Sequence, residues 1–210
     1  MNNQQPLIVI IGGFHNLEIT INFVKYLYSQ IKAIKDLKYI IIPTDKVQPL
    51  DGLSAYNFLS NYLVNQSCFP CPIIVISFSA GVVGAIILGK LWKAWNGEVL
   101  CLLAFDGWGV PLIADFPCYR VSHDHFTHFS SLLLGGEESS FYAQPMVNHL
   151  ELWRSPLEIQ GRWQMKLGVE KTVKMTDFIQ FCLQKEIDKY IKKCKKYPET
   201  EAKNNHKKNN

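Results

Sequence analysis

Ser79 lies where a strongly apolar segment gives way to a cluster of small residues. Residues 73–76 are apolar and β-branched, residues 77–81 read Ser-Phe-Ser-Ala-Gly, and helix-forming residues dominate 85–95. This order predicts a strand, a sharp turn and a helix, with one hydroxyl at the apex of the turn. Such a turn holds the serine Oγ above the sheet, and the helix N-terminus directs backbone N–H groups at the same spot. The chemistry it serves is nucleophilic attack on an acyl carbonyl.

The usual spacing around such a nucleophile is G-x-S-x-G, and here Ser77 takes the place of the first glycine. That position must be small because the turn brings it close to the helix. Two other interpretations of residues 72–89 are weaker. The segment is uncharged and near the lower limit for a membrane-spanning helix, but serines, glycines and β-branched residues interrupt it. A nucleotide-binding turn would need a G-x-G-x-x-G or G-K-[ST] pattern, which is missing here.

Acyl transfer by a serine also requires a base that hydrogen-bonds the serine and a carboxylate that orients the base. Asp106 directly follows the apolar segment 99–105, which comes next along the chain after the strand of the nucleophile. We therefore predict Asp106 as the acid, and Asp115 and Asp124 as weaker candidates. An ordinary turn is the competing interpretation, because Asp-Gly is a common turn pair.

The candidates for the base are His123, His125, His128 and His149. We predict His125, because it lies a short step beyond an expected strand and Phe126 can anchor its loop; His149 and His123 are the alternatives. A metal site formed by the first three histidines and Asp124 is a weaker hypothesis. Their spacing is not the i, i+4 pair of a zincin, and no further ligand is evident.

An oxyanion needs two N–H donors near the nucleophile. The backbone N–H of Ala80, directly after Ser79, is the first that we predict. The second should come from the glycine turn after the first strand, at Gly13 or Phe14, and we choose Phe14. A tight strand-to-helix turn at Gly12-Gly13 is the plainer interpretation, and it is compatible with the same geometry.

The expected elements alternate between strand and helix over the first 122 residues. We predict strands over residues 7–11, 39–42, 73–77, 99–105 and 118–122, and helices over 16–36 (capped by Asn16), 54–65 (capped by Ser54), 80–95 and from 176 onward. Residues 129–134 can begin a helix, whereas 135–145 resemble a loop and 161–173 are irregular. This alternation is typical of an α/β protein with a mostly parallel sheet. Because parallel strands end at one edge, Gly13, Ser79, Asp106 and the residues after Ser122 should converge.

Composition indicates one globular domain, which we place at residues 1–191, followed by a basic tail at 192–210 that we expect to be disordered. The net charge of +4 arises in the last 26 residues, so nucleic-acid binding is not expected. The N-terminus lacks the pattern of a signal peptide, and the six cysteines are expected to be reduced. We therefore expect a cytoplasmic protein without stable membrane insertion, bound metal or cofactor.

Four pieces of the chain resemble the α/β-hydrolase superfamily: Gly12-Gly13-Phe14, Ser77-Phe78-Ser79-Ala80-Gly81, Asp106, and Asp124-His125-Phe126-Thr127. The last is similar to the histidine segment of thioesterase domains. The resemblance covers residues 7–128 and a terminal helix. It implies a reduced, lidless member in which Ser79 is nucleophile, Asp106 acid and His125 base. The chain departs from the family pattern at three points. Ser77 replaces the first glycine of G-x-S-x-G. The acid follows the strand directly after that of the nucleophile, whereas most members use a later strand, and the last strand before the base is short.

These observations predict a serine hydrolase that acts on a small-molecule ester or thioester through an acyl-enzyme intermediate. An apolar acyl groove can be lined by aromatic residues, although for most of them a place in the core is the plainer expectation: Trp108, Phe126, Phe129, Phe141, Tyr142 and Trp153. The alternative is an inactive protein of the same fold that serves binding or assembly.

Overall fold

One eight-stranded sheet forms the centre of the computed structural model, which describes residues 4–136, 139–166 and 168–196. Its strands are β1 (Leu7–Ile11), β2 (Tyr39–Ile42), β3 (Ile73–Phe78), β4 (Val99–Phe105), β5 (Cys118–Ser122), β6 (Ser140–Ala143), β7 (Gln160–Lys166) and β8 (Val169–Lys174). They lie in the order β2-β1-β3-β4-β5-β6-β7-β8. The pairs from β2 to β6 are parallel, and β7 and β8 add an antiparallel hairpin at one edge.

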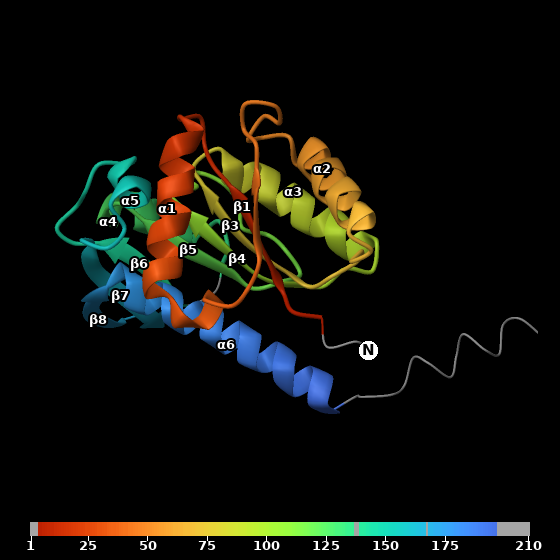
Figure 1. The fold of residues 1–210 in the computed structure, drawn as a ribbon. Helices are drawn as coiled ribbons and strands as arrows, with labels where there is room; N and C mark the ends of the chain where they lie inside the picture. Colours follow the sequence, from red (N-terminus) through yellow and green to blue (C-terminus); the bar gives the residue numbers. More distant parts are fainter. Residues whose placement is uncertain (1–3, 137–138, 167, 197–210) are drawn as a thin grey trace, which may run out of the picture.

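Helices cover both faces of this sheet, which makes the chain a three-layer α/β domain (Figure 1). The helical elements are α1 (Leu17–Gln30), η1 (Lys32–Ile34), α2 (Gly52–Asn65), α3 (Gly81–Ala94), α4 (His125–Leu132), α5 (Glu151–Arg154) and α6 (Met175–Lys196). Side chains of α1, α5 and α6 share one core cluster with the sheet, and those of α2 and α3 share the other.

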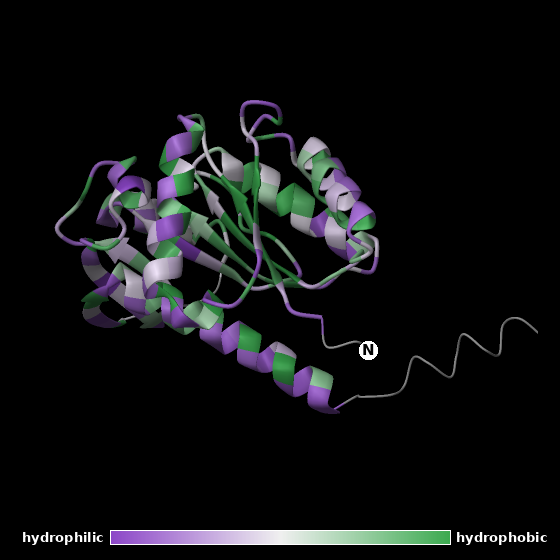
Figure 2. Ribbon diagram, in the orientation of Figure 1, coloured by the Kyte–Doolittle hydropathy of each residue, from purple (hydrophilic) through white to green (hydrophobic). Residues whose placement is uncertain are grey.

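The apolar runs of the sequence form the inner strands because those strands are buried on both faces. In β1, Ile8 and Ile10 enter the cluster beneath α1 and α6, whereas Leu7, Val9 and Ile11 enter the cluster beneath α2 and α3. Figure 2 shows the same contrast, with apolar central strands and helices that are polar on their outer sides. The parallel sheet of the sequence prediction is therefore confirmed.

Strands β6, β7 and β8 lie where the sequence predicted a loop and irregular chain. β8 is the edge strand, and most of its residues are exposed, so it carries no alternation of apolar and polar residues. β6 has only four residues, and β7 begins with Gln160-Gly161-Arg162. These strands are held by pairing with neighbours, which a local pattern does not reveal.

The helix boundaries differ from the prediction at three caps. Asp51, not Ser54, caps α2: its carboxylate accepts the Ser54 N–H at 2.9 Å. Asp124 caps α4, so this helix begins at His125 rather than near residue 129. α1 ends at Gln30, six residues before the expected end. In the part of the chain that the structure describes, no helix is long and apolar enough to cross a membrane.

The last helix, α6, begins at Met175 and continues to Lys196, beyond the domain boundary that we predicted at residue 191. Its buried face packs on β4, β6 and β7. The remainder of the predicted tail, residues 197–210, lies outside the described residues.

Candidate active site

A strained turn after β3 presents the Ser79 hydroxyl. Ser79 has a φ of 54°, a left-handed conformation that non-glycine residues rarely adopt. Its N–H donates to the carbonyl oxygen of Phe105 at 2.8 Å, and α3 begins two residues later at Gly81. A Cβ on Gly81 would lie 2.4 Å from the Gly12 carbonyl oxygen, so only glycine allows this approach of helix and β1 loop.

Ser79, His149 and Asp106 form a continuous hydrogen-bonded chain. His149 Nε2 lies 3.1 Å from Ser79 Oγ, and His149 Nδ1 lies 2.5 Å from Asp106 Oδ2. An ionised carboxylate can accept hydrogen bonds but cannot donate them. His149 Nδ1 therefore carries the proton, and Nε2 is the acceptor that faces the serine hydroxyl. This is the order of groups required for deprotonation of a serine by an oriented imidazole.

The carboxylate of Asp106 is buried and has several donors. Asp106 is 3% exposed and has a φ of 53°. It is the second residue with a strained backbone at this edge of the sheet. Oδ1 accepts from the backbone N–H of His123 at 3.0 Å and faces His123 Nδ1 at 2.9 Å. Burial by itself would raise the pKa of Asp106, but the hydrogen bonds from His123 and His149 outweigh it and hold the pKa below its usual value.

Aromatic packing fixes the segment that carries His149. Trp153 on α5 is fully buried; its ring stacks on Phe23 of α1 and on Phe78 of β3, with centroid distances of 3.4 and 5.2 Å. Phe78 also lies against the His149 ring at 4.7 Å. The backbone N–H of Val147 donates to the His123 carbonyl oxygen at 3.1 Å, which ties the same segment to the end of β5.

His125, which we predicted as the base, does not contact Ser79, and the structure corrects this expectation. Because Asp124 caps α4, His125 begins the helix and its ring packs on Phe129 and Tyr142, with centroid distances of 4.3 and 5.3 Å. The signal for His149 is its place shortly after β6, the last parallel strand. Because residues 135–145 were predicted as a loop, this strand was not expected, and His149 was named only as an alternative base.

The other residues considered as acid, base or metal ligand have structural roles. His128 is buried and hydrogen-bonds Gln164 at 2.8 Å, and Asp115 pairs with Lys93 on the surface. Asp124 is occupied by the Thr127 N–H at 2.6 Å. The metal site suggested by the clustered histidines and Asp124 is therefore not assembled.

Asp106, His123 and His149 are the one group among the described residues whose ligand atoms lie close enough to consider for a metal ion. Their spacing is that of hydrogen bonds, because Asp106 Oδ2 lies 2.5 Å and 2.7 Å from the two Nδ1 atoms. Ligands at about 2.0–2.2 Å from a tetrahedral metal lie farther than this from one another. The arrangement fits protonated nitrogens on a carboxylate better than a metal centre.

The two expected oxyanion donors adjoin the serine. A Cβ on Gly13 would lie 3.0 Å from Ser79 Cβ, so the loop that carries Phe14 passes directly beside the nucleophile. Within residues 4–136, 139–166 and 168–196, neither the Phe14 nor the Ala80 N–H donates to a protein acceptor. Both remain available for an oxygen bound at Ser79.

An open, mainly apolar cleft of about 530 Å³ adjoins Ser79. Its lining comprises Leu50, Ser79, Ala80, Val83, Asp106, Trp108, Val110, His123, Thr127 and His149. The Trp108 indole N–H donates to Ser130 Oγ at 3.2 Å, which anchors this exposed ring on α4. Trp108 is the only one of the six predicted groove aromatics in this lining. Phe141, Tyr142 and Trp153 are buried in the core, whereas Phe126 and Phe129 are exposed outside the lining.

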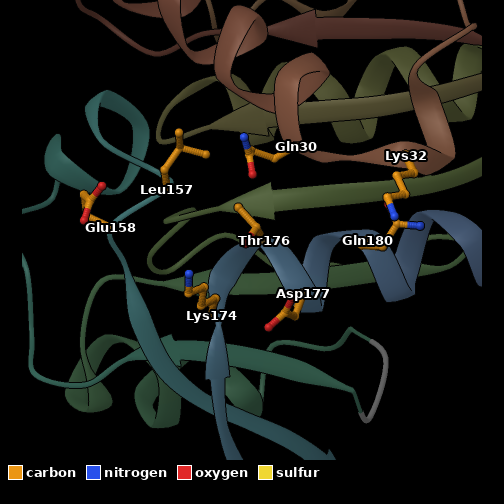
Figure 3. Close-up of a pocket in the computed structure, with 8 residues that line it drawn as sticks. All are labelled: Gln30, Lys32, Leu157, Glu158, Lys174, Thr176, Asp177 and Gln180. Atoms are coloured by element: carbon orange, nitrogen blue, oxygen red, sulfur yellow. The ribbon is translucent and has the colours of Figure 1, made fainter.

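A second hollow of about 510 Å³ lies between the end of α1 and the start of α6 (Figure 3). Acidic and basic side chains are mixed in it: Lys32 and Lys174 against Glu158 and Asp177. None of its lining residues belongs to the cleft at Ser79.

Neither protein-family models nor curated proteins match this chain. The geometry of the residues described above is therefore the basis for a functional proposal.

Proposed function

We propose that this protein is a serine hydrolase of the α/β-hydrolase kind that cleaves a small-molecule ester or thioester. The observation that carries the proposal is the hydrogen-bonded chain from Ser79 Oγ through His149 to the buried carboxylate of Asp106. Two features of the strand order support it: the nucleophile follows a central parallel strand, and the base follows the last parallel strand. The acid follows the strand next to that of the nucleophile, which departs from the family pattern.

In the proposed reaction, His149 Nε2 takes the proton of Ser79 as Oγ bonds to the substrate carbonyl carbon. The carbonyl oxygen gains the negative charge and is stabilised by the N–H groups of Ala80 and Phe14. The carbon–oxygen or carbon–sulfur bond of the substrate then breaks, and His149 returns the proton to the departing alcohol or thiol. Water, deprotonated by His149, releases the acid and restores the serine.

The strain at Ser79 and Asp106 is a second argument for catalysis. Two non-glycine residues with positive φ at adjacent strand ends each destabilise the fold by about 1–3 kcal/mol. Ser67 and Asn96 also have positive φ, but Ser79 and Asp106 are the two that are joined through His149, and a nucleophile and its acid must be held in position. The apolar lining of the cleft favours an uncharged acyl group.

A fluorophosphonate probe tests the proposal, because it reacts covalently with an activated serine. We expect the purified protein to be labelled at Ser79, and Ser79→Ala to abolish labelling. His149→Ala should lower the labelling rate by at least about 10³-fold. His125→Ala is the matched control and should label like the wild type, because its ring faces Phe129 and Tyr142.

A folded wild-type protein that is not labelled, and that hydrolyses none of a panel of p-nitrophenyl esters and acyl thioesters, would refute the proposal in favour of a binding role. Loss of labelling in His125→Ala with retention in His149→Ala would transfer the role of base to His125.

A further inference from the structure

Two imidazoles share the single carboxylate of Asp106. His149 Nδ1 lies 2.5 Å from Oδ2. His123 Nδ1 lies 2.9 Å from Oδ1 and 2.7 Å from Oδ2. The mechanism above uses only His149. His123 is nevertheless part of the same cleft lining, and its ring centroid is 6.0 Å from that of His149.

The groups around His123 are few and can be named. Asp106 faces it from the end of β4, His149 from the segment before α5, and Asp124 from the start of α4, with 3.6 Å between His123 Nε2 and Asp124 Oδ2. His15, on the loop after β1, faces His149 rather than His123, and the pKa of His15 is lowered by burial and then by His149. Two carboxylates, Asp106 and Asp124, thus favour the charged form of His123, and His149 is the neighbouring imidazole.

We propose that His123 is a positioning residue whose proton controls the site: neutral His123 orients Asp106 for catalysis, and protonated His123 slows it. This inference rests on the proposed function, since it concerns the same Ser79, His149 and Asp106.

Neutral His123 orients the carboxylate through two bonds. Its backbone N–H donates to Oδ1, and its Nδ1–H lies within hydrogen-bond distance of both carboxylate oxygens, while Oδ2 also accepts from His149. A buried carboxylate held by several donors has little freedom to rotate, so the His149 ring is kept in line with Ser79 Oγ.

Protonated His123 opposes the step in which His149 gains its proton. Two imidazolium rings 6.0 Å apart would then share one negative charge. At an effective dielectric constant of about 20, this repulsion corresponds to a rate reduction of about ten- to hundredfold. The pKa of His123 is raised by its hydrogen bond to Asp106, against the effect of burial, and also by the charges of Asp106 and Asp124. The proton is therefore taken up above the ordinary histidine value of 6.5.

The labelling rate of Ser79 by a fluorophosphonate, measured from pH 5 to 9, tests the inference without knowledge of the substrate. His123→Asn is the informative variant, because the asparagine amide can donate to Asp106 in place of Nδ1–H but does not titrate. His123→Ala removes the ring donor as well, and His125→Asn is the matched control on the neighbouring segment.

We expect two steps in the acid limb of the wild type, the first a reduction of about tenfold or more as His123 protonates. His123→Asn should lose the first of these two steps, because the asparagine amide does not titrate. His123→Ala should label more slowly across the whole range, and His125→Asn should reproduce the wild-type profile.

Superimposable profiles of wild type and His123→Asn would overturn the inference while leaving the proposed function in place. Absence of labelling in the wild type at every pH would overturn the proposed function and this inference together. If His123→Asn does not fold, NMR titration of the His123 ring in the wild-type protein decides: protonation of His123 must coincide with the first step in the labelling rate, and a first step at a different pH refutes the control that we propose.

Discussion

Gly81→Ala tests the close approach of α3 to the loop after β1. A Cβ at this position would lie 2.4 Å from the Gly12 carbonyl oxygen and 2.8 Å from that of Ile11. Real Cβ atoms essentially never approach closer than 3.0 Å, so the backbone must separate by at least 0.6 Å, the difference between 3.0 and 2.4 Å. Both contacts are with backbone oxygens, which cannot move aside by rotation of a side chain.

The expected loss of stability follows from two opposing effects. Overpacking destabilises by about 1–3 kcal/mol, and replacing glycine in a helix returns up to about 1 kcal/mol. Because the clash is with backbone, we expect a net loss of about 1–2 kcal/mol in the free energy of unfolding. For a chain of this size that lowers Tm by about 2–8 °C.

The effect on the site should be larger than the effect on stability. The displaced loop carries Gly13 and Phe14 beside Ser79, and a misplacement of about 1 Å in such a site lowers rates by up to about 100-fold. We therefore expect Gly81→Ala to lower the fluorophosphonate labelling rate by about ten- to hundredfold at 25 °C, where the variant remains folded.

Gly89→Ala is the matched control in the same helix. A Cβ there would lie 2.5 Å from the Phe116 ring, far along α3 from Ser79, and that ring can move. We expect destabilisation of about 0–2 kcal/mol and labelling within about twofold of the wild type. Wild-type labelling in Gly81→Ala, or equal losses in both variants, would refute the reasoning.

Three further outcomes are expected. Ser77 is fully buried, and its Oγ has no hydrogen-bond partner among the residues that the structure describes. Ser77→Ala should therefore raise the free energy of unfolding by about 1 kcal/mol in urea titrations, and a loss of stability would contradict this. Tyr119 Oη donates to the buried Glu186 carboxylate at 2.5 Å, so Tyr119→Phe should destabilise by about 1–3 kcal/mol, whereas the exposed Tyr62→Phe should not. The pKa of Asp106 is lowered in the folded state, so its carboxylate stabilises the fold above pH 3.8 and this contribution fades as the pH falls below that value. The difference in unfolding free energy between wild type and Asp106→Asn should therefore shrink from pH 7 to pH 3, and a constant difference would count against the lowered pKa.

The strands that form the inner sheet were predictable because burial on both faces requires continuous apolar residues. β1, β4 and β5 have the predicted bounds, and β3 extends one residue further. The apolar edge strand β2 also has its predicted bounds, although it is partly exposed. The edge at β6, β7 and β8 was not predictable in the same way. β6 is buried but has only four residues, β7 mixes buried and exposed residues, and β8 is mostly exposed. Their strand conformation depends on pairing with neighbours that lie elsewhere in the chain.

Sequence alone determined the local part of the candidate site: the turn at Ser79 and the place of Asp106 at the end of the next strand follow from chain order and residue size. Only the tertiary structure decided the histidine. Three imidazoles lie closer in sequence to Asp106, but a capped helix turns His125 outward, His128 is buried against Gln164, and His123 bonds Asp106 from its other side. His149 reaches Ser79 because a buried Trp153 docks α5 between α1 and β3. That contact joins residues 130 positions apart, and no local pattern records it.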